Sequence, residues 1–298
     1  MNKSRININY RQKTLIGLLK AFGEHISNTD FQKYLFLYTQ EFQDEPSFDF
    51  VPYKYGGFSF QSYIDKRYLI QKGILVDTDD WRLQDSFWDI EFFQDESYKR
   101  FYEQYSHLKK GALIQHVYRL YPYYAINSEI AKDWMKPEEL SVINMARPSK
   151  NNMCFYTIGY EGSSFENYLN RLIQNNVITL IDIRRNPLSR KYGFSKKTLS
   201  DTVKKFGINY IHIPELGITS DKRQTLNTQT DYDELFEAYE KQELRKNKAA
   251  LSQVFEIFKD HKRVAITCFE ALVCMCHRGR VAKVLSQRTD WQYDISHI

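Results

Sequence analysis

The second half of the chain contains short, mostly apolar runs of strand length, and segments with helical spacing separate them. The run 177–183 is almost continuously apolar, which is typical of a strand buried on both faces. Strands that alternate with helices predict a parallel sheet covered on both sides. We therefore expect a Rossmann-like α/β domain here. Its expected strands are 155–158, 177–183, 209–213, 263–268 and 294–298, and its expected helices are 165–175, 196–206, 232–258 and 277–287.

The first 85 residues have a different pattern, with short helices followed by a hairpin. Leu15, Leu18 and Phe22 have the spacing of one helix face, and Ser27 is a suitable cap for a second helix. Gly73 ends a third helix, and the apolar triplets 74–76 and 81–83 flank an aspartate-rich turn. Helices followed by a small hairpin are the outline of a winged helix.

A connecting region, residues 86–150, is aromatic and predicted to be helical. Its aromatic pairs Phe87-Trp88 and Phe92-Phe93 are expected to pack on the preceding helices. Pro148 and the polar run 149–152 mark a linker. We therefore predict two domains, a mainly helical one at 1–150 and the Rossmann-like one at 151–298.

Composition limits the classes of partner. No run approaches the roughly 20 apolar residues of a membrane span, and the charged N-terminus does not resemble a signal peptide. We therefore expect a cytoplasmic protein without a membrane partner. The net charge is +5, and residues 184–205 carry eight basic residues against one acid, Asp201. Such a stretch favours a phosphate-bearing partner, nucleic acid or nucleotide, although a solvated helix face is the alternative.

Polar side chains follow the predicted strands. In open α/β sheets, ligands bind beyond the carboxyl ends of the strands. Two arginines near a helix N-terminus suit a phosphate or carboxylate. The residues expected to gather there are Tyr160, Asp182, Arg184, Glu215, Cys268 and Glu270, with Cys276, His277 and Arg278 from the following helix start.

The same segments resemble a known family. The shared motifs are Tyr156-Thr-Ile-Gly159, Asp182-x-Arg184-x-x-Pro187-x-Ser189-Arg190, Tyr210-x-His212-x-Pro214-Glu215-Leu216-Gly217 and Cys268-x-Glu270-x(5)-Cys276-His277-Arg278. On these motifs, residues 155–298 resemble the domain-of-unknown-function family 488. The resemblance implies a prokaryotic protein from nucleic-acid-processing or defence neighbourhoods, but no particular reaction. The loop between Glu270 and Cys276 departs from the family pattern because it is apolar and carries the additional Cys274.

The N-terminal segment resembles the Panacea (phage-associated antitoxin) domain. The resemblance rests on a helix start at 31–36, a glycine turn at 53–59 and the sequence Lys72-Gly73-Ile74-Leu75 before the hairpin. It implies a recognition or regulatory module in a toxin–antitoxin or phage context, with a protein partner as one option.

Four interpretations of the strand-end residues stay open. The preferred one is a hydrolase or glycosidase that acts on nucleic acid or a nucleotide. Its catalytic residues would be Asp182, Glu270, His277 and Glu215, its anion-binding residues Arg184, Arg278, Tyr160 and Arg190, and its supporting cysteines Cys268, Cys276 and Cys274.

The other three interpretations use the same residues differently. A non-catalytic binding regulator would use Asp182–Arg184 and Glu270–Arg278 as internal ion pairs. A thiol enzyme would use Cys274 in a C-x(5)-R arrangement with Arg280. A zinc site would use Cys268, Cys274, Cys276 and His277, although adjacent residues at a helix start are expected to point apart. The paired carboxylates could instead bind a divalent ion. No cofactor is predicted, and the sequence leaves the oligomeric state open.

Overall fold

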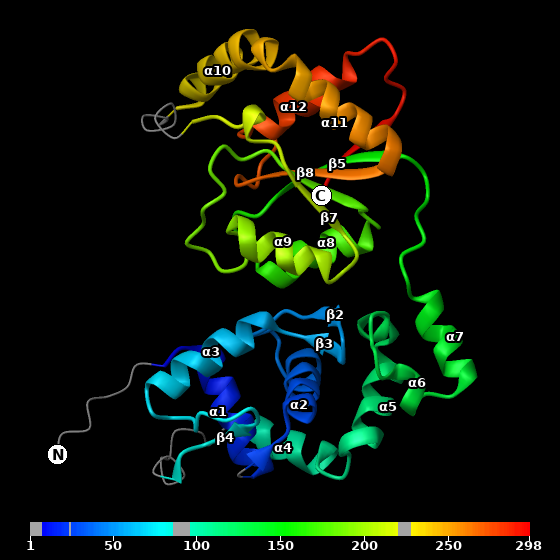
Figure 1. Cartoon of the computed structure of the whole chain (residues 1–298). Helices are drawn as coiled ribbons and strands as arrows, with labels where there is room; N and C mark the ends of the chain where they lie inside the picture. Colours follow the sequence, from blue (N-terminus) through cyan, green and yellow to red (C-terminus); the bar gives the residue numbers. More distant parts are fainter. Residues whose placement is uncertain (1–7, 24, 86–95, 220–227) are drawn as a thin grey trace, which may run out of the picture. The chain divides into compact units, whose positions relative to one another are not determined.

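The chain folds into two compact units, Met1–Arg147 and Pro148–Ile298, and each is described by itself (Figure 1). The computed structural model describes residues 8–23, 25–85, 96–219 and 228–298. Within these ranges, no helix combines the length and the apolar character needed to cross a bilayer. The aromatic pairs Phe87-Trp88 and Phe92-Phe93 lie outside the described residues.

The N-terminal unit is mainly helical, as predicted. Its helices are α1 (Tyr10–Phe22), α2 (Asn28–Glu41), α3 (Phe60–Gln71), α4 (Glu96–Tyr105), α5 (Lys110–Leu120), the 3-10 turn η2 (Pro122–Ala125), α6 (Ala131–Trp134) and α7 (Pro137–Met145). Its strands are β1 (His25–Ile26), β2 (Val51–Tyr53), β3 (Gly56–Phe58) and β4 (Trp81–Arg82). Ser27 caps α2 as expected, since its hydroxyl accepts a hydrogen bond from the backbone N–H of Asp30.

The predicted hairpin forms after α3. The backbone N–H of Val76 donates to the carbonyl of Arg82, and Leu75 bridges Leu83. Strand β4 also pairs with β1, so three short segments lie side by side. The buried amine of Lys66 donates to three carbonyls of the turn at 78–80, at 3.1, 2.8 and 2.9 Å, and thereby fixes its path. The order α1–β1–α2–α3–hairpin is the expected winged-helix outline, with β2 and β3 inserted between α2 and α3.

The C-terminal unit is a five-stranded parallel sheet, as predicted. Its strands are β5 (Cys154–Gly159), β6 (Thr179–Asp182), β7 (Asn209–His212), β8 (Arg263–Cys268) and β9 (Asp294–His297), in the spatial order β7-β6-β8-β5-β9. Its helices are α8 (Phe165–Gln174), α9 (Lys196–Lys204), the 3-10 turn η3 (Pro214–Leu216), α10 (Gln229–Ala238), the π-helix η5 (Tyr239–Leu244), α11 (Lys248–His261) and α12 (His277–Ser286).

Helices cover both faces of this sheet (Figure 1). Helices α8 and α9 lie on one face, and α10, α11 and α12 lie on the other. A hydrophobic core lies on the second face, where Ile181, Ile266 and Phe155 pack with Phe255 and Leu285. Burial on both faces explains why the central strands are apolar along their whole length.

The register of β6 and β8 decides where the polar strand ends point. Asp182 is paired with Thr267, so these two side chains face the same side of the sheet. Cys268 is the next residue and points to the opposite side, because side chains alternate along a strand. Cys268 shares the face of Ile266 and α12, whereas Asp182 faces α8 and α9.

Candidate functional site

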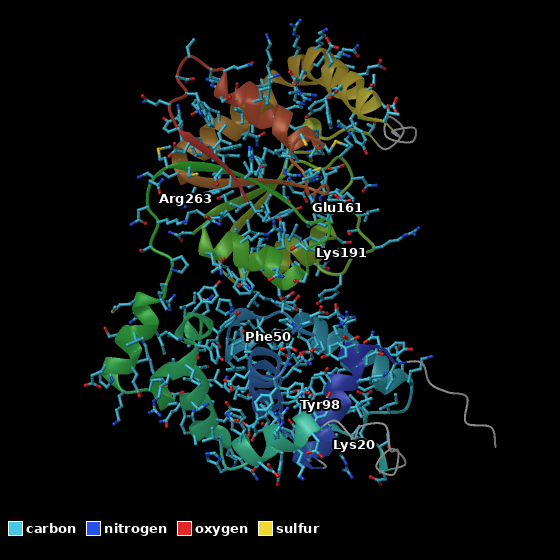
Figure 2. All side chains as sticks on the ribbon, turned by 180° about the vertical axis from the view of Figure 1, so that it is seen from behind. Lys20, Phe50, Tyr98, Glu161, Lys191 and Arg263 are labelled. Carbon is cyan, nitrogen blue, oxygen red and sulfur yellow. The ribbon has the colours of Figure 1, made fainter. Side chains whose placement is uncertain are left out.

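A pocket of about 310 Å³ opens at the carboxyl ends of the strands. Figure 2 marks the two ends of the sheet: Glu161, which follows β5, lies on the opposite side from Arg263, the first residue of β8. Lys191 lies on the same side as Glu161. The residues lining the pocket are Tyr160, Arg184, Arg185, Asn186, Leu188, Ser189, Arg190, Ile218, Cys268, Phe269 and His277.

On the α8/α9 face of this edge, Asp182 and Arg184 form a buried ion pair. The Nε and Nη2 atoms of Arg184 donate to the two oxygens of Asp182 at 2.9 and 2.6 Å, and the backbone N–H of Arg184 adds a third bond at 3.1 Å. The hydroxyl of Tyr210 donates to the same carboxylate at 2.6 Å. Four hydrogen bonds thus occupy Asp182, which is fully buried.

The remaining donor group of Arg184 is also engaged. Its Nη1 donates to the hydroxyl of Tyr160 and to the carbonyl of Phe194, both at 2.8 Å. The ring of Tyr160 stacks on Phe194 with centroids 4.1 Å apart. Burial and the negative charge of Asp182 raise the pKa of Tyr210. This geometry favours a structural role for the pair, in which Arg184 fixes the start of the loop 184–195.

A second cluster lies on the α12 face and consists of Cys268, Glu270, Cys276 and His277. The thiols of Cys268 and Cys276 donate to Oε2 of Glu270 at 3.2 and 2.9 Å. Nδ1 of His277 lies 3.4 Å from the sulfur of Cys268. The candidate ligand atoms of the four residues all lie within 4.8 Å of one another, so this set could hold a metal ion. Cys268, Cys276 and His277 are buried, and Glu270 is half-buried.

The backbone explains how the adjacent Cys276 and His277 converge. Cys276 is the N-cap of α12 and has extended torsion angles of φ −136° and ψ 137°, whereas His277 is the first helical residue. This change of conformation turns both side chains toward Cys268 and Glu270. The expectation that neighbouring residues at a helix start would point apart is therefore wrong here. Burial raises the pKa of the Cys276 thiol well above its ordinary value, and the neighbouring Cys268 and Glu270 add to the effect.

Arg278 is buried and holds the loop of this cluster. Its guanidinium donates to the carbonyls of Glu270 and Ala271, the latter at 2.7 Å. The end of β5 is closely packed against the same backbone, because a Cβ atom at Gly159 would lie 1.9 Å from the Glu270 carbonyl oxygen. Glycine at 159 is therefore required for this close approach. We expected Arg278 to bind an anion, but its guanidinium instead binds two backbone carbonyls.

The arrangement of Cys274 and Arg280 bears on the thiol-enzyme interpretation. Cys274 is exposed on the loop, outside the four-residue cluster. Arg280 binds Glu240 at 3.2 Å and stacks over the ring of Phe236. The two residues of the C-x(5)-R arrangement are thus not directed at a common oxyanion site.

The remaining predicted residues lie in two places. Arg190 is exposed and lines the pocket. Glu215 is exposed on η3 and lines a separate hollow of about 90 Å³, which shares Arg185 and Ile218 with the first. The structure therefore brings Tyr160, Arg184 and Arg190 together with Cys268 and His277 around one pocket, and it places Glu215 beside that pocket.

Sequence reasoning gave no site role to several residues of this edge. Arg185, Asn186 and Ser189 line the pocket, and Tyr210 binds Asp182. All three pocket residues lie in the loop that follows β6, so the strand-end rule could have included them. Tyr210 could not be found in this way, because its role depends on the pairing of β7 with β6.

The comparisons with known proteins support only part of the resemblances inferred from the sequence. No curated protein and no solved structure matches the chain. None of the comparisons supports a Panacea domain in the N-terminal unit. One family matches the segment that includes β6, β7, β8 and the cluster at 268–278, without β5 and β9. It is the family described as "Domain of unknown function DUF488", matched at residues 164–285, so the C-terminal unit contains a DUF488 domain.

Proposed function

We propose that the C-terminal unit binds a phosphate group of a nucleotide or nucleic acid in the strand-end pocket and hydrolyses a bond next to it. One observation carries the proposal: the pocket places three arginines around the same space as Cys268 and His277. Arginine binds phosphate oxygens through paired N–H groups. A volume of about 310 Å³ is at the lower end of the range for small-molecule sites, which suits one nucleotide.

The three arginines contribute unequally to anion binding. The charge of Arg184 is balanced by Asp182, whereas Arg185 and Arg190 are exposed. We therefore assign the phosphate contacts to Arg185 and Arg190, with the hydroxyl of Ser189 as a further donor. Lys196 and Lys197 begin α9 directly after this loop and add positive charge for a longer polyanion.

The hydrolytic step is assigned to the cluster side of the pocket. Water would add across the scissile phosphate-ester or glycosidic bond, with its proton passing to the leaving group. We assign proton transfer to His277 and Glu270. His277 lines the pocket, and Glu270 is linked to His277 through Cys268, which contacts both side chains. Asp182 is left out of this step because its oxygens are already occupied.

Binding tests the first part of the proposal. We would titrate adenosine monophosphate and a single-stranded oligonucleotide into the full chain at several salt concentrations. Arg185→Gln and Arg190→Gln are each expected to weaken binding about tenfold, as loss of a charge-assisted hydrogen bond predicts. The matched control is Lys205→Gln, an exposed cation at the opposite end of α9. Equal weakening in all three variants would contradict a defined phosphate site.

Turnover tests the second part. Release of free base or of phosphate from the oligonucleotide would be followed chromatographically for the wild type and for Glu270→Gln. We expect Glu270→Gln to abolish turnover while it leaves binding nearly unchanged. Turnover that survives in Glu270→Gln would remove Glu270 from the reaction.

A second candidate function is a binding regulator without catalysis. It is favoured by the internal bonding of Asp182 and Arg184, whose polar atoms are satisfied by protein groups as expected of structural residues. This candidate predicts the same binding results with no turnover of either ligand.

We further propose that the N-terminal unit is a recognition or regulatory module in a phage-defence or toxin–antitoxin context. The winged-helix outline and the Panacea-like glycine turn support it. Challenge of bacteria that express the full chain with a panel of phages tests the context. Plaque counts that match those of an empty-vector strain would contradict it.

A further inference from the structure

We propose that Cys268, Glu270, Cys276 and His277 form a binding site for one zinc-type divalent cation. None of its four donors is an assigned phosphate contact, so zinc binding does not rest on the proposed phosphate ligand. Glu270 and His277 are also the proton-transfer groups of the proposed hydrolysis, so a bound ion would make them metal ligands in place of that role. It lies at the carboxyl end of β8, where the strand, the following loop and the start of α12 meet.

The donor spacing is close to that of a tetrahedral site. With bonds of about 2.0–2.3 Å, neighbouring donor atoms around zinc lie roughly 3.3–3.8 Å apart. Three donor pairs here are 3.2, 3.4 and 2.9 Å apart, and every pair lies within 4.8 Å. Shifts of about 1 Å or less would therefore bring all four donors to bonding distance. The hydrogen bonds between thiols and carboxylate hold the donors in this arrangement without an ion.

The donor set selects the kind of ion. Two thiolates with an imidazole favour zinc and related transition metals, whereas magnesium and calcium prefer oxygen donors. When the ion binds, the two thiols give up their protons to solvent, so three anionic ligands would surround a doubly charged cation. The charge of Arg278, which acts on Cys276, offsets the remaining negative charge.

The surroundings of His277 fit a metal ligand. Its Nε2 lies 3.4 Å from the carbonyl oxygen of Ile183, while its Nδ1 faces Cys268. A proton on Nε2, shared with this carbonyl, leaves the Nδ1 lone pair for the ion. Metal-ligating histidines commonly donate their second ring N–H to such a partner, which fixes the ring orientation.

The main competing arrangement is a disulfide between Cys268 and Cys276. Both sulfurs belong to the same compact cluster, so an oxidised pair would occupy two of the four donors. Alkylation followed by mass spectrometry separates the two arrangements, because a disulfide resists the reagent until it is reduced. Free thiols together with a bound ion support the metal site, and a disulfide without an ion overturns it.

The test uses the purified full chain. Metal content would be measured by mass spectrometry of the elements, and the chelated protein would then be titrated with Zn²⁺ and with Co²⁺. We expect about one ion per chain. We also expect the intense near-ultraviolet absorption of cobalt–thiolate bonds, together with visible bands typical of tetrahedral cobalt.

Variants assign the ligands. Cys276→Ser and Glu270→Gln are expected to weaken zinc binding at least 100-fold and about tenfold, respectively. Cys274→Ser is the matched control, because this exposed cysteine lies two residues before Cys276 on the same loop but outside the cluster. Circular dichroism of each variant verifies folding, and Glu270→Gln keeps the test valid if Cys276→Ser does not fold. Equal metal binding by Cys276→Ser and Cys274→Ser, or the absence of thiolate absorption, would overturn the proposal.

The same variants separate this site from the proposed function. If Cys274→Ser and Arg190→Gln bind zinc normally while only Arg190→Gln loses phosphate binding, zinc binding is independent of the phosphate contacts. A Cys276→Ser variant that loses zinc binding but still binds adenosine monophosphate would also show that phosphate binding does not need the metal site.

Discussion

The buried pair of Asp182 and Arg184 allows a quantitative test of its structural role. Asp182→Asn keeps the shape of the side chain but removes its charge, so the guanidinium of Arg184 stays buried without a counterion. Breaking a buried ion pair from one side costs about 3–5 kcal/mol of unfolding free energy. We expect the upper part of this range, since Asp182 accepts four hydrogen bonds and an amide nitrogen cannot replace an accepting oxygen.

The assay is urea unfolding, followed by hydrogen exchange in peptides from residues 148–298, so that the C-terminal unit is measured alone. With a urea slope of about 2 kcal/mol per molar, the midpoint should fall by roughly 2–2.5 M. The control is Asp201→Asn, an exposed acid on α9, with an expected change within about 0.5 kcal/mol. Replacement of both partners, as Asp182→Leu with Arg184→Met, should recover much of the loss. A midpoint shift below about 0.5 M for Asp182→Asn would refute the structural role and make Asp182 a candidate catalytic acid again.

Three further predictions concern other parts of the molecule. Gly159→Ala should destabilise the C-terminal unit by about 3 kcal/mol in urea unfolding, because its Cβ would lie 1.9 Å from a backbone oxygen. The control Gly162→Ala should cost only about 1–2 kcal/mol, because that glycine has a positive φ. Equal costs for the two variants would contradict the close approach at Gly159. A thiol reagent at pH 7 should label Cys274 quickly and Cys276 slowly, since burial raises the pKa of Cys276, and peptide mapping that finds both labelled at one rate would be the contrary result. Burial lowers the pKa of Lys33 to about 7, so the unfolded chain binds more protons than the folded chain above that pH. The N-terminal unit should therefore gain unfolding free energy, on the order of 5 kcal/mol at most, as the pH rises from about 7 toward 10. A Lys33→Met variant whose stability depends on pH as the wild type does would disprove the assignment.

The sequence predicted the order of strands and helices because apolar runs and caps are local signals. It also identified the edge of the sheet at which polar residues gather, since that follows from parallel strands alone. It could not show that Asp182 and Cys268 point to opposite faces. That fact depends on the pairing of Asp182 with Thr267, and a shift of one residue would reverse it.

Two other features could not be read from the sequence for similar reasons. The convergence of Cys276 and His277 depends on the extended backbone at the N-cap, which the adjacent letters do not reveal. The engagement of Arg278 with two carbonyls depends on the path of the loop 269–276. Motif residues that suggest one acid–arginine–histidine pocket therefore separate into an ion pair and a cysteine–histidine cluster.

The order of the strands also has a consequence for synthesis on the ribosome. Strand β5 is made first in its unit, yet its only neighbours are β8 and β9, which are made last. Cys154 pairs with Arg263, more than a hundred residues later, so β5 has no partner strand until β8 has been synthesised. Such distant pairings are slow to form and leave a strand edge exposed in the meantime. The nascent C-terminal unit therefore carries an unpaired apolar strand until nearly the whole chain has emerged, and this is the stage at which a chaperone would protect it.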